Sequence, residues 1–137
     1  MKELKDYTKE EIRILPAGED LDYLMYVIYM HGILGKDYLI AVDIAKIQIG
    51  CYESFQYSRN NIASINVLEK TGKTYTISKY KGVAEEVDYE VIIDIPDDSQ
   101  IWSVEVAGET LALAISRAIV LLSWLELKEK QNEDRDV

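Results

Sequence analysis

Two arginines stand at positions where a cation is an unusual choice. Arg59 lies in the first turn of a predicted helix, where the helix dipole already attracts anions. Arg117 interrupts the apolar face of another predicted helix, and a charged group in such a place needs a partner or a ligand. A guanidinium suits phosphate and carboxylate groups, and an aromatic ring can stack on a base. We therefore predict a small pocket for an anionic, ring-bearing ligand, formed by Arg59, Arg117, Tyr57, Lys79 and Trp102.

Arg59 is the first choice for the phosphate contact in this pocket. Ser58 is predicted to cap the helix, and the backbone N–H groups from Ser58 to Asn61 have no partner within it. An anion there would meet the dipole, these N–H groups and the side chain together. Tyr57 comes directly before the predicted cap, so its ring is placed to stack on the ligand.

Several of these groups also have a simpler structural interpretation, which is the more frequent one. Arg117 can form an ion pair with a carboxylate such as Glu105 or Glu109. Three tyrosines lie on one side of a predicted helix and can belong to the core instead of stacking on a ligand: Tyr23, Tyr26 and Tyr29.

Catalytic patterns are scarce in this chain. Three aspartates could hold a divalent cation through oxygen ligands, but aspartate also suits solvated turns, and we favour a turn for Asp94, Asp97 and Asp98. His31 is the only histidine and is expected near the end of a helix as a cap. Cys51 is expected to be a small buried apolar residue. We therefore expect no catalytic residue, no metal site and no cofactor.

The composition narrows the class of protein. The chain has 137 residues and a formal net charge of −10, so its average surface repels nucleic-acid phosphates. A single cysteine agrees with a reducing compartment. The chain has no apolar run long enough to cross a membrane and no apolar signal segment near Met1. We expect a cytoplasmic protein that binds neither nucleic acid nor membrane.

The elements before the predicted site are helical. Thr8 and Glu11 form a capping box that opens a short helix ending near residues 15–16. A second helix begins around residues 18–20 and is stopped at residues 31–32. Residues 33–57 favour a strand or hairpin, because β-branched residues dominate between two glycines. The spacing of apolar residues over 39–49 also fits one face of a helix.

The rest of the chain predicts an α+β fold. A helix over residues 59–70 precedes three strands with period-two patterning over 74–80, 87–95 and 100–106. Their short connections predict an antiparallel meander, with Val91 and its alternating neighbours facing the helices. A last helix over 109–128 is apolar nearly all round. We expect one domain over residues 1–130 with a polar tail over 131–137.

Three segments, in order, resemble the phage ABA-sandwich domain family. Residues 15–22 read LPAGEDLD, which resembles the family's opening LPAGxxLD. Residues 57–63 resemble its second block, a helix start of the form YSxxxxA, and residues 106–118 resemble a strand-to-helix junction ending in AIxRA. The resemblance implies a phage or prophage origin and an α/β sandwich. It implies no agreed activity, so no catalytic residue is carried over from the family.

These observations together predict a non-enzymatic phage or prophage accessory protein. It would sequester a small anionic, nucleotide-like ligand, with counter-defence as one role. A homo-oligomer is expected, because the helices over 20–31 and 109–128 carry more apolar surface than three strands can cover.

Three other functions were weighed against this one. One alternative is an interaction module that inhibits a host protein, and another is a metal-dependent enzyme acting on a phosphate-bearing substrate. Double-stranded RNA binding shares the α-β-β-β-α order, but the last helix opens with Ala107-Gly108-Glu109-Thr110 where lysines would be required.

Overall fold

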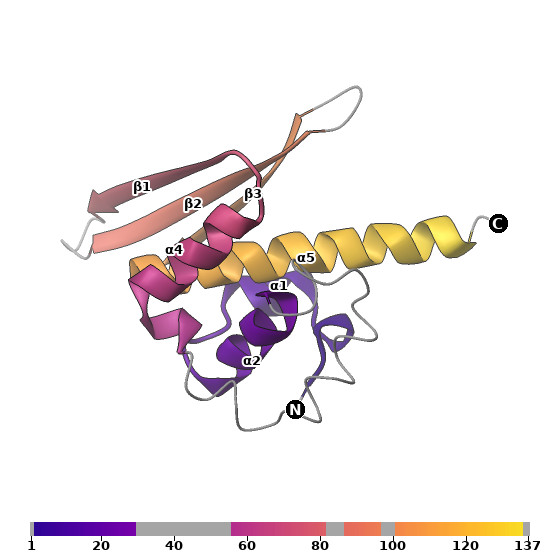
Figure 1. Cartoon of the computed structure of the whole chain (residues 1–137), viewed down its shortest axis with the longest axis horizontal. Coiled ribbons are helices and arrows are strands. Elements are labelled where there is room, and N and C mark those ends of the chain that lie inside the picture. Colours follow the sequence, from indigo (N-terminus) through magenta and orange to yellow (C-terminus); the bar gives the residue numbers. More distant parts are fainter. Residues whose placement is uncertain (1, 30–55, 82–86, 97–100, 136–137) are drawn as a thin grey trace.

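A three-stranded antiparallel sheet and a long helix form the centre of this α+β protein (Figure 1). The computed structural model describes residues 2–29, 56–81, 87–96 and 101–135. Residues 33–55 of the predicted strand or hairpin segment 33–57 lie outside these residues, as do the helix stop at residues 31–32 and Cys51. At the end of that segment, Tyr57 lies in a 3-10 turn and not in a strand. The elements, in chain order, are α1 (Lys9–Arg13), α2 (Glu19–Val27), α4 (Asn61–Lys70), β1 (Tyr75–Lys81), β2 (Val87–Pro96), β3 (Ile101–Gly108) and α5 (Leu111–Arg135). Two 3-10 turns complete them: η1 (Leu4–Asp6) and η4 (Tyr57–Arg59).

The predicted meander is confirmed. β2 lies in the middle of the sheet and pairs antiparallel with β1 and β3, with Ile77 opposite Val91 and Val91 opposite Val106. Period-two patterning puts apolar side chains on the face toward α5, where Val91 and Ile93 are fully buried. The predicted inward face of β2 is therefore correct at these two residues.

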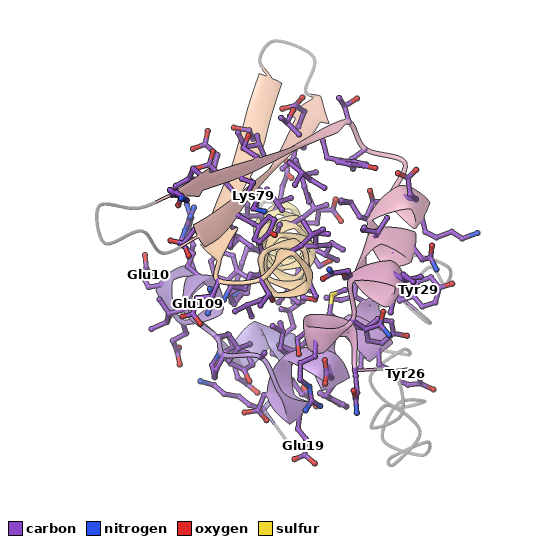
Figure 2. All side chains as sticks on the ribbon, turned by 90° about the vertical axis from the view of Figure 1, so that its left-hand side faces the viewer. Glu10, Glu19, Tyr26, Tyr29, Lys79 and Glu109 are labelled. Carbon is purple, nitrogen blue, oxygen red and sulfur yellow. The ribbon has the colours of Figure 1, made fainter. Side chains whose placement is uncertain are left out.

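α5 runs between two layers and is buried on almost every side. Residues 112–122 are buried except for Arg117, which is half-buried. β2 and β3 pack on one side of α5, whereas α1, α2 and η1 contact it elsewhere (Figures 1 and 2). The core is therefore thicker than a two-layer arrangement of helices on a sheet.

This packing explains why the helix is apolar nearly all round. The apolar surplus from which we predicted a homo-oligomer is buried within one chain, so the oligomer stays a prediction without that support. Tyr23 and Tyr26 are buried on α2, as the core interpretation expected, and they are not exposed for stacking.

Local sequence signals set several helix ends. The capping box at α1 is confirmed, because Thr8 Oγ1 accepts a hydrogen bond from Glu11 N at 3.1 Å and Glu11 Oε1 accepts one from Thr8 N at 3.0 Å. Two residues after the end of α4 at Lys70, Gly72 has a φ of 69°, which suits glycine. At the turn from β3 to α5, a Cβ on Gly108 would stand 2.6 Å from the backbone N of Ala114. Only glycine lets the strand pass this close to the helix.

Two helix boundaries near the predicted site differ from expectation. The cap of α4 is Asn60, whose Oδ1 accepts from Ala63 N at 3.1 Å, and Ser58 lies in the preceding turn η4. α5 begins at Leu111 after Thr110, and it continues to Arg135, beyond the predicted end near residue 128 and into the predicted tail. α4 packs along α5 and η4, whereas α5 packs on β2 and β3. Of the two helices that we expected to cover the sheet, α5 is therefore the main cover.

Candidate functional site

The first turns of α4 and α5 lie side by side and are tied together. Asn61 Oδ1, at the start of α4, accepts a hydrogen bond from the backbone N of Ala112 at the start of α5, at 3.0 Å. Thr110 Oγ1 accepts from Leu113 N at 3.2 Å and caps the same turn of α5. The positive ends of two helix dipoles therefore point into one region of the molecule.

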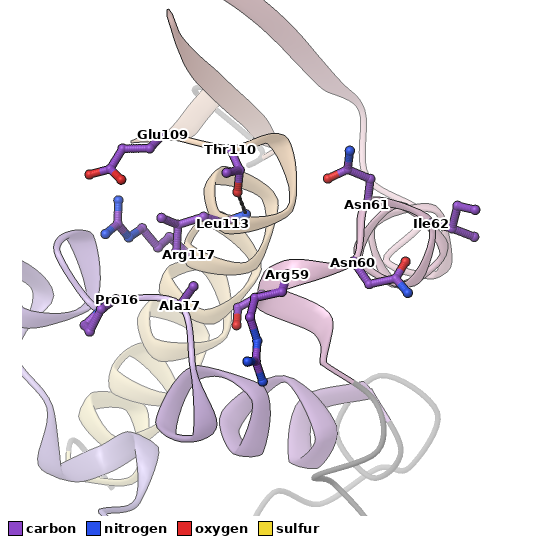
Figure 3. Close-up of a pocket in the computed structure, with 11 residues that line it drawn as sticks. Pro16, Ala17, Arg59, Asn60, Asn61, Ile62, Glu109, Thr110, Leu113 and Arg117 are labelled. Carbon is purple, nitrogen blue, oxygen red and sulfur yellow. Dashed lines mark hydrogen bonds between the residues drawn. The ribbon is translucent and has the colours of Figure 1, made fainter. Parts of the chain in front are cut away.

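A cleft of about 850 Å³ opens at this junction (Figure 3). We call it the α4/α5 cleft. The segment before α2 and the starts of the two helices form its walls. Its lining residues are Pro16, Ala17, Ser58, Arg59, Asn60, Asn61, Ile62, Glu109, Thr110, Leu113 and Arg117.

Arg59 lines the cleft, as predicted, but its guanidinium is not unpaired. The side chain runs toward α2 (Figure 3), where Nη2 lies 3.4 Å from Asp22 Oδ2. Asp22 is buried and also accepts hydrogen bonds at 2.7 Å from the backbone N and the Oγ of Ser58. Because Asp22 has these two short bonds, its pairing with the 52% exposed side chain of Arg59 is the weakest of the three.

Ser58 therefore has a different role from the predicted helix cap. It is fully buried, bonds Asp22, and accepts a hydrogen bond from the backbone N of Gly18 at 3.0 Å. This small network joins the start of α2 to η4 and fixes the direction in which Arg59 leaves the backbone.

Arg117 also lines the cleft, and its main partners are backbone carbonyls. Its Nε donates to Leu15 O at 2.8 Å and its Nη1 donates to Ala107 O at 3.0 Å. Burial lowers the pKa of the guanidinium, and the nearby negative charge of Glu109 acts in the opposite direction. Glu109 is thus an electrostatic neighbour, and the predicted ion pair is replaced by bonds to the main chain. A guanidinium carries five N–H donors, so these two bonds leave further donors for a ligand.

Tyr57 and Lys79 are not among the residues that line the α4/α5 cleft. Tyr57 is only 3% exposed, and its ring meets the edge of Tyr29 with the centroids 6.3 Å apart. Burial raises the pKa of the Tyr57 phenol. Lys79 is exposed on β1 (Figure 2), with Nζ 5.8 Å from the ring centroid of Tyr89, and Trp102 stands on β3 opposite Ile95. Of the predicted pocket residues, Arg59 and Arg117 therefore line one cleft, whereas Tyr57 and Lys79 lie elsewhere.

The sequence pattern did not single out the polar residues that frame the cleft. Asn61 and Thr110 hold the two helix starts together, and Pro16 and Leu113 supply apolar wall. Asparagine and threonine are strong helix caps, so the run Asn60-Asn61 and the residue before Leu111 were available signals. That these two signals meet in space is a tertiary property.

The described residues contain neither a cluster of possible metal ligands nor a helix that could span a membrane. Asp94 is half-buried on β2, whereas Asp97 and Asp98 lie outside the residues that the structure describes. In the described ranges, no three His, Cys, Asp or Glu side chains gather in a way that could hold a metal ion. Neither α5 nor any other helix there combines the length and hydropathy that a bilayer crossing requires.

A comparison with known protein families, with curated proteins and with solved structures finds no match to this chain. The resemblance to the phage ABA-sandwich family, carried by residues 15–22, 57–63 and 106–118, therefore stays a prediction.

Proposed function

We propose that this protein is a non-enzymatic binding protein that holds a small anionic, nucleotide-sized ligand in the α4/α5 cleft. One observation carries the proposal: two helix N-termini and the side chains of Arg59 and Arg117 converge on the same cleft. Its volume of about 850 Å³ falls within the range of small-molecule sites.

The local charge of the cleft favours an anion. The two arginines contribute +2, and Glu109 together with the Asp22 that pairs with Arg59 contributes −2. The remaining positive charge comes from the two helix starts, each roughly half a positive charge. The balance is positive on a chain whose formal net charge is −10. The backbone N–H groups of Ala63, Ala112 and Leu113 already donate to caps. A phosphate or carboxylate at the helix starts would therefore meet the N–H groups that precede them, on Asn61 and Ile62 of α4 and on Leu111 of α5.

Arg59 can move toward such a ligand at small cost. Its contact with Asp22 is long and half-exposed, and Asp22 keeps the two bonds from Ser58 when Arg59 leaves. The pair is exposed only on the arginine side, because the Asp22 side chain is 3% exposed. The two short bonds from Ser58 therefore limit the cost of leaving this buried carboxylate without its cation. Arg117 is already fixed by two carbonyls, so it would act as a preorganised charge while Arg59 closes on the ligand.

The rest of the ligand would rest on an apolar wall. Pro16, Ala17 and Leu113 line the side of the cleft between α2 and α5. Tyr57 is buried, so a base or ring would contact these aliphatic groups in place of the predicted tyrosine. A nucleotide, with a phosphate at one end and a flat ring at the other, matches a cleft that has positive helix starts on one side and an aliphatic wall on the other. In a phage or prophage setting, sequestration of such a ligand would be an accessory, counter-defence activity.

Titration with inorganic phosphate, followed by amide NMR shifts, tests the site without knowledge of the ligand. We expect the largest shifts at Asn61 and Ile62 on α4 and at Leu111 and Ala112 on α5. The same titration of Arg59→Ala should give much smaller shifts. Shifts spread over the surface, or unchanged in the variant, would contradict the proposal. Mass spectrometry of small molecules released by heating the purified protein would then identify the natural ligand.

A further inference from the structure

The outward backbone groups at the two edges of the sheet have different surroundings. At the β3 edge, Arg13 Nη1 donates to Glu105 O and Arg117 Nη1 donates to Ala107 O. These two guanidinium groups occupy carbonyls that would otherwise accept bonds from another strand. At the β1 edge, the described part of the chain supplies no further strand, because the sheet order is β1-β2-β3.

The alternation of hydrogen bonds shows which backbone groups of β1 face outward. Asp94 N donates to Thr74 O at 2.8 Å, so this residue pair is a hydrogen-bonded pair of the β1–β2 ladder. Pairs of this kind alternate along an antiparallel ladder. The residues between them direct N–H and C=O away from β2; in register order they are Tyr75, Ile77, Lys79 and Lys81.

The β1 edge is exposed, cationic and partly apolar. Every residue from Thr76 to Lys81 is exposed, including Ile77 at 37% and Tyr80 at 43%. The charged residues of β1 are Lys79 and Lys81, and the strand has no acidic residue. The two lysines lie opposite Tyr89 and Val87 of β2. The acidic Asp88 and Glu90 lie opposite Tyr80 and Ser78, and so on the other face of the sheet.

We propose that the β1 edge binds an extended acidic segment of a partner protein, which adds a fourth strand to the sheet. The outward N–H and C=O groups of Ile77 and Lys79 would pair with the segment's backbone, as in other cases of strand addition. Carboxylates on the segment would lie opposite Lys79 and Lys81. Cross-strand pairs of opposite charge stabilise a sheet, whereas like charges opposite each other destabilise it.

A second copy of this chain is a poorer occupant of the same edge. Pairing β1 with itself would bring lysines of both copies to one face, and lysine on an edge strand opposes such association. The seven residues of β1 are also far fewer than the roughly 20–30 residues a side of a stable interface. An acidic peptide avoids the repulsion and needs only a short strand.

The probe is a fluorescein-labelled seven-residue peptide that alternates glutamate and valine, with a matched peptide in which lysine replaces glutamate. Fluorescence anisotropy at low salt should show binding of the acidic peptide and no binding of the basic one. Ile77→Pro removes one outward N–H but no bond to β2, so the fold should persist while affinity falls about three- to tenfold. Hydrogen exchange should slow at Ile77 and Lys79 in the complex.

A second variant reverses the charge of the two lysines and leaves the backbone N–H groups of β1 in place. Lys79→Glu combined with Lys81→Glu should lose the acidic peptide and gain the basic one. Absence of binding to the wild-type protein would overturn the proposal. So would equal binding of both peptides by the exchanged variant, or protection at Asn61 and Leu111 in place of β1. Concentration-dependent self-association abolished by Ile77→Pro would instead assign the edge to a second copy.

Discussion

Asn61 at the start of α4 caps the start of α5, through the 3.0 Å hydrogen bond that its Oδ1 accepts from Ala112 N. One side chain therefore sets the spacing of the two helix N-termini that frame the α4/α5 cleft. Because this oxygen accepts a structural bond, two substitutions can separate two effects: the loss of the acceptor and the addition of a negative charge at the same place.

Asn61→Ala and Asn61→Asp should differ in a diagnostic way. Alanine removes the cap and should lower the free energy of unfolding by about 1 kcal/mol, the usual effect of losing a helix cap. Aspartate keeps the acceptor oxygen, so stability should stay near the wild-type value, but its negative charge in the cleft should weaken phosphate binding. Urea unfolding and the phosphate titration measure the two effects. Equal phosphate affinity of the wild type and Asn61→Asp would show that the anion does not sit at this helix junction.

Arg59→Ala should weaken binding of an anionic ligand by about 1.5–3 kcal/mol, the range for hydrogen bonds to charged groups. The melting temperature should change little, because Asp22 keeps its two bonds from Ser58. Lys79→Ala is the matched control: it removes one positive charge that lies on β1, outside the cleft. Calorimetric titration of all three proteins with the identified ligand checks this. An equal loss of binding free energy in Arg59→Ala and Lys79→Ala would point to a general effect of the protein's net charge.

Gly108→Ala should destabilise the protein by about 1–3 kcal/mol, as overpacked sites do. The added methyl group would stand 2.6 Å from the backbone N and 2.9 Å from the Cα of Ala114, and neither atom can move without shifting α5. Ser103→Ala, at an exposed position of the same strand, should leave the unfolding midpoint nearly unchanged. Chemical denaturation measures both variants. A Gly108→Ala protein as stable as the wild type would show that β3 and α5 can separate at this turn.

Ser116 and Ser64 are both fully buried serines, but only one has a known hydrogen-bond partner. Ser64 Oγ donates to Asn61 O at 3.0 Å, whereas Ser116 Oγ has no partner among the described residues. A buried hydroxyl without a partner costs free energy, roughly 1–3 kcal/mol in proteins. Ser116→Ala should therefore keep or raise thermal stability, and Ser64→Ala should lower it by about 1 kcal/mol. A lower thermal stability of Ser116→Ala would mean that the Ser116 hydroxyl has a hydrogen-bond partner in solution.

Glu11 should contribute to the acid sensitivity of the protein. Hydrogen bonds from Lys2 and from the backbone of Thr8 lower the pKa of this carboxyl below 4.5 in the folded chain. Its stabilising effect is therefore complete above the unfolded value and is lost as the pH falls through the folded pKa. Glutamine preserves the capping box but not the charge. The stability difference between wild type and Glu11→Gln, measured by urea unfolding, should shrink as the pH falls below about 4.5. A difference that is constant with pH would exclude this linkage.

The sheet could be predicted from the sequence because its signals are local. Alternation in β2 placed Val91 and Ile93 on the buried face, and the spacing of Thr8 and Glu11 was enough to predict the α1 cap. The start of α4 was misplaced because Ser58 and Asn60 are both good caps, and a buried carboxylate 36 residues earlier, Asp22, recruits Ser58.

The candidate site was predictable only in part, for a similar reason. Arg59 and Arg117 were identified because a cation is costly at each position. Tyr57 is adjacent to the site in sequence, yet its ring turns into the core toward Tyr29. Lys79 and Trp102 belong to other strands of the sheet, and no local pattern encodes their distance from a helix start.

The central position of α5 also has a consequence for synthesis of the chain. α5 is the last of the described elements, yet it supplies the surface on which β2, β3, α1 and α2 pack. While the ribosome is still making residues before 111, the apolar faces of the sheet and of α2 lack the helix that covers them in the folded protein. Folding must therefore wait until translation has passed this helix, and a nascent chain halted before it would expose most of the future core to chaperones and to other chains.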